Sequence, residues 1–173
     1  MADPVEKPKF TFEPLSPKHD RAAFSCGIPA LDNYIKTQAG QSVRKNLSAV
    51  FVLTPDGKTI AGYFTLSQYS LRLDEIPEEI AKKLTKHSEV PATLIGRLAT
   101  SIDYRGHGLG EMLLMDALKR CLKVSQQIGS WAVIVDAKDE NAFTFYKKYG
   151  FNELPSVPNR LFMMIATISK MFE

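Results

Sequence analysis

The segment 103–118, DYRGHGLGEMLLMDAL, places three glycines within five positions and continues as a helix-like apolar pattern. Ordered glycine costs conformational entropy, so this concentration predicts a turn in which bare backbone has to approach something closely. The run before the turn, ATLIGRLATS, is apolar and typical of a buried strand. A strand, a bare turn and a helix in this order predict one βαβ-like unit in the second half of the chain.

The turn is a candidate phosphate site. The first N–H groups of a helix have no partner within the helix, and they lie at the positive end of its dipole. Arg105 opens the turn and can add a charge-assisted contact to an anion. GHGLGE has neither the Rossmann spacing nor a Walker Gly-Lys-Ser/Thr, so dinucleotide-binding and nucleotide-hydrolase interpretations are not supported. The alternative is a tight structural connection, because glycine turns are common in α/β units.

Hydrophobic periodicity predicts the remaining elements. Strands are predicted around Phe10 and Phe12 and on both sides of the hairpin signal Asp56–Gly57. A helix is predicted from Pro29, with Leu31, Tyr34, Ile35 and Ala39 on one face. Further predicted elements are a charged helix at 75–87, a strand at 92–101, a helix at 110–127, a strand at 131–137, a helix at 141–149 and a final strand at 160–168. The class is α+β (mixed α/β), with a flexible lead at 1–8 and a single domain at 9–173.

Composition narrows the function classes. The net charge of +3 is mildly basic, which is compatible with an anionic ligand. Cys26 and Cys121 do not form a disulfide framework, which favours a reducing cytoplasm, and scattered histidines such as His19, expected to be solvated, do not predict a metal site. We expect no membrane span, since no apolar run approaches about 18 residues.

RGHGLG matches the Arg/Gln-x-x-Gly-x-Gly/Ala acyl-CoA signature of the GNAT N-acetyltransferases through Arg105, Gly108 and Gly110. AFTFYKKYGF, residues 142–151, resembles a later helix of the same family. The resemblance implies a mostly antiparallel twisted sheet that splays between its fourth and fifth strands and is flanked by helices. It also implies acetyl-CoA as co-substrate.

The resemblance implies a set of donor-binding residues. The pantetheine is expected along Leu98, Ala99 and Thr100, where backbone N–H groups would polarise the thioester carbonyl. The diphosphate is expected on the turn formed by Arg105, Gly106, His107, Gly108, Leu109 and Gly110. Asp139 and Ala142 complete the predicted donor site. Asp139 departs from the family, which often has Asn there, and this puts the contact credited to that Asn in doubt.

Tyr146 is the candidate general acid. Its family counterpart points at the CoA sulfur, and a phenol with a pKa of about 10 is protonated at neutral pH. The sequence pattern alone favours an amphipathic core residue at Tyr146, whereas the register with the family favours the acid. Tyr149 is a nearby competitor interpreted as packing or surface. No residue pattern identifies a general base.

FSCGIPALDNYIKTQA, LIGRLATSIDYRGHGLG and FYKKYGF resemble the TacT-like acetyltransferase toxins of toxin–antitoxin pairs. The resemblance implies an aminoacyl-tRNA acceptor, whose acetylation would block translation. It also implies a small ribbon-helix-helix antitoxin and a homodimer. The alternatives are a protein, polyamine or small amine as acceptor, or a catalytically weak binding module of a DNA-bound repressor complex.

Three basic residues are candidate acceptor contacts: Lys36, Arg44 and Arg97. For individual surface cations such as Lys36 and Arg44, a solvated surface is the competing interpretation. Arg97 is different because it interrupts the apolar strand TLIGRLAT. It either points into the active-site cleft, toward an anionic acceptor or CoA, or forms a buried ion pair with an Asp or Glu.

Overall fold

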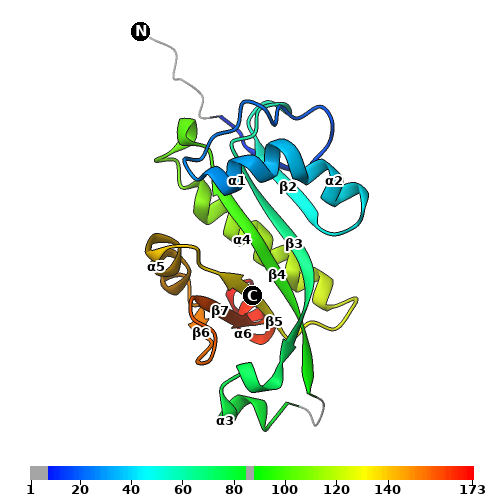
Figure 1. Cartoon of the computed structure of the whole chain (residues 1–173), viewed down its shortest axis with the longest axis vertical. Coiled ribbons are helices and arrows are strands. Elements are labelled where there is room, and N and C mark those ends of the chain that lie inside the picture. Colours follow the sequence, from blue (N-terminus) through cyan, green and yellow to red (C-terminus); the bar gives the residue numbers. More distant parts are fainter. Residues whose placement is uncertain (1–7, 85–87) are drawn as a thin grey trace. The chain divides into compact units, whose positions relative to one another are not determined.

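The computed structural model describes residues 8–84 and 88–173. Residues 1–7 of the predicted lead, and 85–87 at the end of the predicted charged helix, lie outside the described residues. The elements in chain order (Figure 1) are β1 (Thr11–Pro14), α1 (Pro29–Asn33), η1 (Tyr34–Gln38), α2 (Ala39–Arg44), β2 (Ala49–Thr54), β3 (Gly62–Arg72), η2 (Leu73–Glu75), α3 (Glu78–Ala81), β4 (Glu89–Thr100), η3 (Ile102–Tyr104), α4 (Leu109–Ser125), β5 (Ala132–Asp136), α5 (Glu140–Lys148), β6 (Asn152–Glu153), β7 (Arg160–Met164) and α6 (Ile165–Met171).

The seven described strands hydrogen-bond in the order β1-β2-β3-β4-β5-β7-β6. The pairs β1–β2, β5–β7 and β6–β7 are antiparallel, whereas β4 and β5 are parallel. The β4–β5 register runs from Ala92↔Ala132 to Ile95↔Val135, and β4 then continues to Thr100. This confirms the predicted fold class, and the pairing ends between the fourth and fifth strands, where the resemblance implied a splay.

The chain forms two compact units, Met1–Thr65 with Arg97–Leu113 and Leu66–Gly96 with Leu114–Glu173. β3, β4 and α4 each run through both units. The single domain over 9–173 stays a prediction. No helix among the described residues is long and apolar enough to cross a membrane.

In the first unit, the helical segment 29–44 buries the apolar face that the sequence predicted. Leu31, Tyr34, Ile35 and Ala39 are all buried in one cluster. Removing a side chain the size of Ile35 from water contributes about 1.5–3 kcal/mol. The helix starts at Pro29, as predicted, because proline suits a first helical position. It widens into a π-helix over Tyr34–Gln38, which the sequence did not predict.

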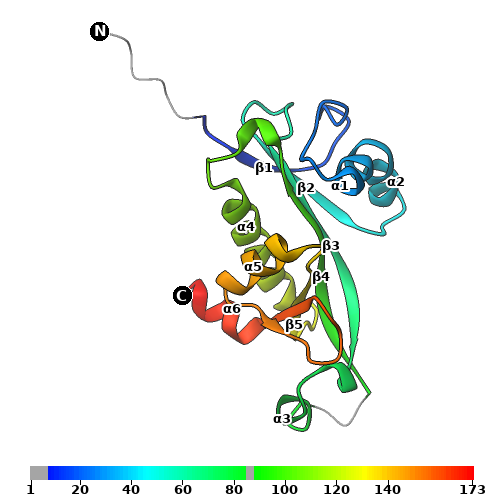
Figure 2. The same ribbon diagram turned by 60° about the vertical axis from the view of Figure 1, so that its left-hand side comes forward.

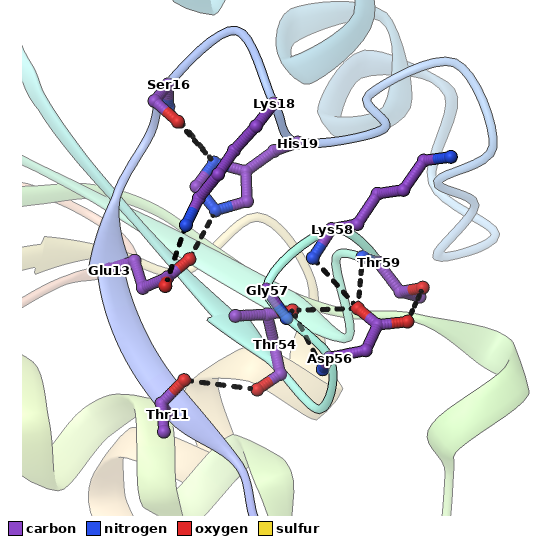
Figure 3. A network of polar contacts seen from close by, with 10 residues as sticks. All are labelled: Thr11, Glu13, Ser16, Lys18, His19, Thr54, Asp56, Gly57, Lys58 and Thr59. Atoms are coloured by element: carbon purple, nitrogen blue, oxygen red, sulfur yellow. Dashed lines mark hydrogen bonds and ion pairs between the residues drawn. The ribbon is translucent and has the colours of Figure 1, made fainter.

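Asp56 organises the connection between β2 and β3 (Figure 3). Its Oδ1 accepts the backbone N–H groups of Lys58 and Thr59, at 2.9 and 2.6 Å, and its Oδ2 accepts the Thr59 hydroxyl at 2.7 Å. These bonds lower the pKa of the Asp56 carboxyl well below its usual range, since they favour the charged form. Gly57 adopts φ +81°, the left-handed conformation that glycine takes most readily.

The expectation that His19 is solvated is wrong, because its side chain is 4% exposed. The Ser16 N–H donates to His19 Nδ1 at 3.0 Å, so the other ring nitrogen, Nε2, carries the proton and donates to Glu13 at 2.6 Å (Figure 3). The pKa of Glu13 is lowered, first by this hydrogen bond and then by that of Lys18. The polar neighbours of His19 in the sequence indicated an exposed ring, whereas Glu13 of β1 supplies a carboxylate partner that allows the ring to be buried.

In the second unit, the predicted final strand at 160–168 is correct only in its first half. β7 ends at Met164, and the chain continues as α6 (Figure 2). Met164 pairs with Ala132, the first residue of β5, so the partner strand has ended at this point. A helix then satisfies its own backbone hydrogen bonds and buries Ile168.

Gly62 lies at a close approach in the first unit. A Cβ added there would lie 2.8 Å from Leu113 Cδ1 and 3.0 Å from the carbonyl oxygen of Ala99. We expect Gly62→Ala to lower the free energy of unfolding by about 1–3 kcal/mol, because the backbone oxygen cannot move aside by a rotamer change. Urea unfolding measures this. Gly129→Ala is the control, since a Cβ at Gly129 meets nothing within 4 Å; equal losses in both variants would contradict the prediction.

Candidate active site

The glycine turn exposes its backbone. Gly106 and Gly108 have φ values of +85° and +69°, and a Cβ at either position would meet nothing within 4 Å. Side chains rarely adopt this conformation, which explains why glycine occupies both positions. Helix α4 begins at Leu109, which is buried, while Gly106 and Gly108 are exposed. The turn therefore presents a helix N-terminus with open space in front of its glycines.

The two polar side chains of the turn bond to protein carbonyl groups. Arg105 donates from Nη2 to the carbonyl oxygen of Cys26 at 3.2 Å. His107 lies with Nδ1 3.1 Å from the carbonyl oxygen of Tyr104, to which an Nδ1–H donates. Arg105 thus ties the turn to Cys26, and the His107 ring is engaged within the turn itself.

The end of β4 holds the three residues predicted to bind the pantetheine. Ala99 is buried, and Leu98 and Thr100 are half-buried. All three follow Ile95, the last β4 residue in register with β5. The backbone N–H and C=O groups of these residues on the β5 side of β4 therefore have no hydrogen-bond partner in β5. An extended ligand needs such unpaired groups if it is to pair with the strand.

The surroundings of Arg97 exclude one of the two alternatives left open by the sequence, the buried ion pair. Its guanidinium carbon lies 3.5 Å from the centroid of the Tyr34 ring. Within residues 8–84 and 88–173, no carboxylate lies within ion-pair distance of Arg97. The half-buried guanidinium therefore packs on an aromatic face, and the structural ion pair with an Asp or Glu is not formed.

The other two predicted acceptor contacts, Lys36 and Arg44, are exposed on the helical segment 29–44. No hydrogen bond or ion pair among the described residues joins either side chain to the glycine turn. Their role in acceptor binding stays a prediction.

Helix α5 positions Tyr146 and begins with an Asp cap. Asp139 Oδ1 accepts the backbone N–H of Ala142 at 2.8 Å, which satisfies one of the unpaired donors of the first turn. The Asp139 carboxylate is therefore engaged as an N-cap. Tyr146 lies in the buried part of the helix at 7% exposure, edge-on to the rings of Phe145 and Phe151.

Burial raises the pKa of the Tyr146 phenol above its ordinary value of about 10, and the negative charge of Asp136 adds to the shift. Both effects disfavour the phenolate, so the hydroxyl keeps its proton at neutral pH. Tyr146 can therefore donate a proton, which a general acid has to do.

A cluster centred on Arg160 was not predicted. Arg160 Nε donates to Asp136 Oδ1 at 2.7 Å, and its Nη1 donates to the Tyr69 hydroxyl. Glu75 Oε1 lies 3.9 Å from the same guanidinium. Because Asp136 acts on the Tyr146 phenol, Arg160 limits the negative charge near the candidate acid. Tyr69 and Arg160 are 91 positions apart, and no local pattern signals their contact.

Cys26 and Cys121 are buried free thiols, and burial raises their pKa values to about 11 and about 12. Thiols in this state are poor nucleophiles at neutral pH. Among the described residues, no group of three or more His, Cys, Asp or Glu side chains is arranged to hold a metal ion.

The acetyltransferase (GNAT) domain family matches residues 25–162. The probable toxin TacT of Sinorhizobium fredii is 37% identical over 169 residues, which cover 92% of this chain and 93% of that protein. A tRNA-acetylating toxin of Mycobacterium tuberculosis is 31% identical over 151 residues, covering 87% of this chain and 89% of that protein.

Solved structures of toxins share the fold. AtaT complexed with acetyl-methionyl-tRNAfMet matches with a TM-score of 0.88 at 26% identity, over 95% of this chain and 100% of that one. A tyrosine-to-phenylalanine mutant of AtaT, bound to the C-terminus of the antitoxin AtaR and acetyl-CoA, matches with a TM-score of 0.81 at 25% identity. This match covers 94% of this chain and 98% of that one.

The raised pKa of Tyr146 can be measured. Phenolate absorbance followed against pH in the wild type and in Tyr146→Phe should show no loss of signal near pH 10 in the variant, because Tyr146 ionises only at higher pH. Tyr149→Phe is the matched control for loss of one half-buried tyrosine. A difference spectrum in which Tyr146 titrates below pH 10 would contradict the burial argument.

Proposed function

This chain belongs to the GNAT acetyltransferase family, and we propose that it transfers the acetyl group of acetyl-CoA to the amino group at the aminoacyl end of charged tRNA. Acetylation of that amine removes the nucleophile needed for peptide-bond formation, so the enzyme acts as a toxin that blocks translation. The observation that carries the proposal is the near full-length similarity to a tRNA-acetylating toxin, 31% identical over 87% of this chain.

The donor site is built on backbone. The exposed N–H groups around Gly106 and Gly108 suit a diphosphate, and the β4 residues beyond Ile95 suit an extended pantetheine. Placed in this way, the thioester carbonyl accepts a hydrogen bond from the Leu98–Thr100 backbone, which stabilises the oxyanion that forms on attack. The AtaT complex with acetyl-CoA supports the same co-substrate for this chain.

The reaction is a direct transfer. The neutral amine nitrogen attacks the thioester carbon, a C–N bond forms, and the C–S bond then breaks. The departing thiolate takes its proton from the Tyr146 hydroxyl, whose buried environment keeps it protonated. The attacking nitrogen releases one proton to solvent as the amide forms, and a proton taken up from solvent restores the Tyr146 phenol. The amine of an aminoacyl ester is weakly basic, so much of it is neutral near pH 7 and a strong base from the protein is not required. The buried thiols Cys26 and Cys121 take no part.

The partners follow from the same similarity. AtaT is bound by the C-terminus of an antitoxin, and we infer that a small antitoxin neutralises this chain in a comparable way. The place of action is then the cytoplasm, where charged tRNA is found. A homodimer stays a prediction.

The first experiment follows labelled acetyl from acetyl-CoA into charged tRNA, with uncharged tRNA, a peptide mixture and spermidine as parallel acceptors. We expect label on charged tRNA alone. Label on the peptides or on spermidine would retain the acetyltransferase chemistry and reject the tRNA acceptor. Label on none of them would favour a binding module.

Tyr146→Phe tests the general acid. The variant should lower kcat by about 100-fold with little change in the KM for acetyl-CoA, because the thiolate then leaves without a proton donor. Steady-state kinetics on charged tRNA measures this, and Tyr149→Phe is the matched control. Near wild-type kcat in Tyr146→Phe, with acetyl-CoA still bound, would show that another group protonates the thiolate.

Gly108→Ala tests the diphosphate turn. A Cβ there would project into the open space in front of the turn and strain the backbone, and we expect the KM for acetyl-CoA to rise about tenfold, which corresponds to about 1.4 kcal/mol. Gly57→Ala carries a comparable strain at φ +81° in the β2–β3 connection and should leave that KM unchanged. The diphosphate assignment is rejected if both variants have the wild-type KM.

A further inference from the structure

The Tyr34 ring is held in place by its aromatic contacts. It stacks on Tyr63, with centroids 6.2 Å apart and an interplanar angle of 20°. Tyr63 is itself fixed, since its hydroxyl donates to the Leu31 carbonyl at 2.7 Å and its ring meets Phe24 edge-on. The Tyr34 hydroxyl is buried and has no hydrogen-bond partner among the described residues. The position of the Tyr34 side chain is therefore fixed by the contacts of its ring and not by its hydroxyl.

Arg97 uses this ring as a support. The separation of 3.5 Å between its guanidinium carbon and the ring centroid is a packing distance, and a guanidinium that stacks on an aromatic face keeps its N–H donors directed outward in its own plane. In the described chain, Arg97 has no hydrogen-bond acceptor and no carboxylate partner. A half-buried cation without a counter-ion favours the binding of an anion. The anion replaces the water contacts that the cation loses on burial, and it neutralises the charge.

Tyr34 is also the first residue of the π-helix Tyr34–Gln38. A π-turn interrupts the regular α-helical register and is less stable than a continued α-helix, and such turns are frequent at functional sites. Here it sets the position of the ring beneath Arg97. The pair thus combines an irregular backbone, a fixed ring and an unpaired guanidinium within the first unit.

We propose that Tyr34 and Arg97 form a phosphate subsite for the acceptor, in which Tyr34 is a positioning residue and Arg97 binds a phosphodiester at the 3′ end of the charged tRNA. The proposal rests on the function proposed above. Both proposed substrates carry phosphate, so a phosphate group is the anion that Arg97 would meet. The position of Arg97 along β4 favours the phosphate of the acceptor over that of CoA.

Chain order along β4 separates the two phosphate sources. The glycine turn follows Thr100, at the carboxyl end of the strand, and would hold the diphosphate of CoA. Arg97 precedes Leu98–Thr100, so it lies at the other end of the proposed pantetheine track, near the thioester. Phosphates of CoA are remote from that end of their own molecule, whereas the 3′-terminal phosphodiester of tRNA is close to the aminoacyl amine.

The test measures KM for both substrates in Arg97→Met, with Arg72→Met as the matched control. Arg72 is an exposed arginine paired with Asp74. We expect Arg97→Met to raise the KM for charged tRNA about tenfold, the effect of losing one charge-assisted contact, with the KM for acetyl-CoA unchanged. An amino acid methyl ester has no phosphate, so its KM as acceptor should be the same in Arg97→Met and in the wild type. A raised KM for acetyl-CoA alone would assign the phosphate to CoA and overturn the proposal.

The Tyr34 variants separate positioning from folding. Tyr34→Phe keeps the ring and removes an unpaired hydroxyl, so it should have the wild-type KM for charged tRNA. Tyr34→Leu removes the support and should reproduce the KM increase of Arg97→Met while still binding acetyl-CoA. Equal KM values in the wild type, Tyr34→Leu and Arg97→Met would overturn the subsite.

Salt dependence gives a readout that does not need turnover. Fluorescence anisotropy with uncharged tRNA should show that Arg97→Met reduces the slope of log K against log salt by about 0.7, the value for one phosphate contact on a single strand. An unchanged slope would overturn the subsite even if the wild type fails to acetylate charged tRNA. Failure of the wild-type reaction with the expected change in slope would instead reject the proposed acceptor chemistry and retain the subsite.

Discussion

The end of the parallel pairing between β4 and β5 is the constraint on which the proposed chemistry depends. The register stops at Ile95↔Val135, although β4 continues to Thr100. In a continuous sheet, the N–H and C=O groups of Leu98–Thr100 on that side would be used by the next strand. Because β5 does not pair with them, these groups are left for the backbone hydrogen bonds to a substrate that we propose. The same stretch carries Arg97 at its start and leads to the glycine turn after its end.

The proposed donor turn and the proposed acceptor subsite would hold phosphate by different physical means. The turn relies on backbone, so it needs glycine at the two left-handed positions and an open space in front of them. The subsite relies on one delocalised cation, so it needs a support that does not neutralise the charge. An aromatic face meets that requirement better than a carboxylate, which would occupy the donors that the substrate has to use.

The environment of Tyr146 shows how burial selects the protonation state of an acid. Desolvation disfavours the phenolate, and the charge of Asp136 acts in the same direction. Arg160 balances the charge of Asp136 and orients its carboxylate through two direct hydrogen bonds. The candidate acid therefore depends on a charged pair that does not itself have to touch a substrate.

The sequence by itself determined the features that depend on neighbours along the chain. The left-handed glycines of the turn, the buried stripe from Leu31 to Ala39 and the Asp56–Gly57 connection all follow from local backbone preference and periodicity. The tertiary structure alone decided the contacts between distant segments. Among them are the hydrogen bond from Arg105 to Cys26 and the stacking of Arg97 on Tyr34. It also decided the burial of His19 against Glu13 and the start of α6, where β5 offers no further partner. Local patterns record the conformation that each segment prefers, whereas the partner of a buried polar group is set by packing between segments that sequence spacing does not encode.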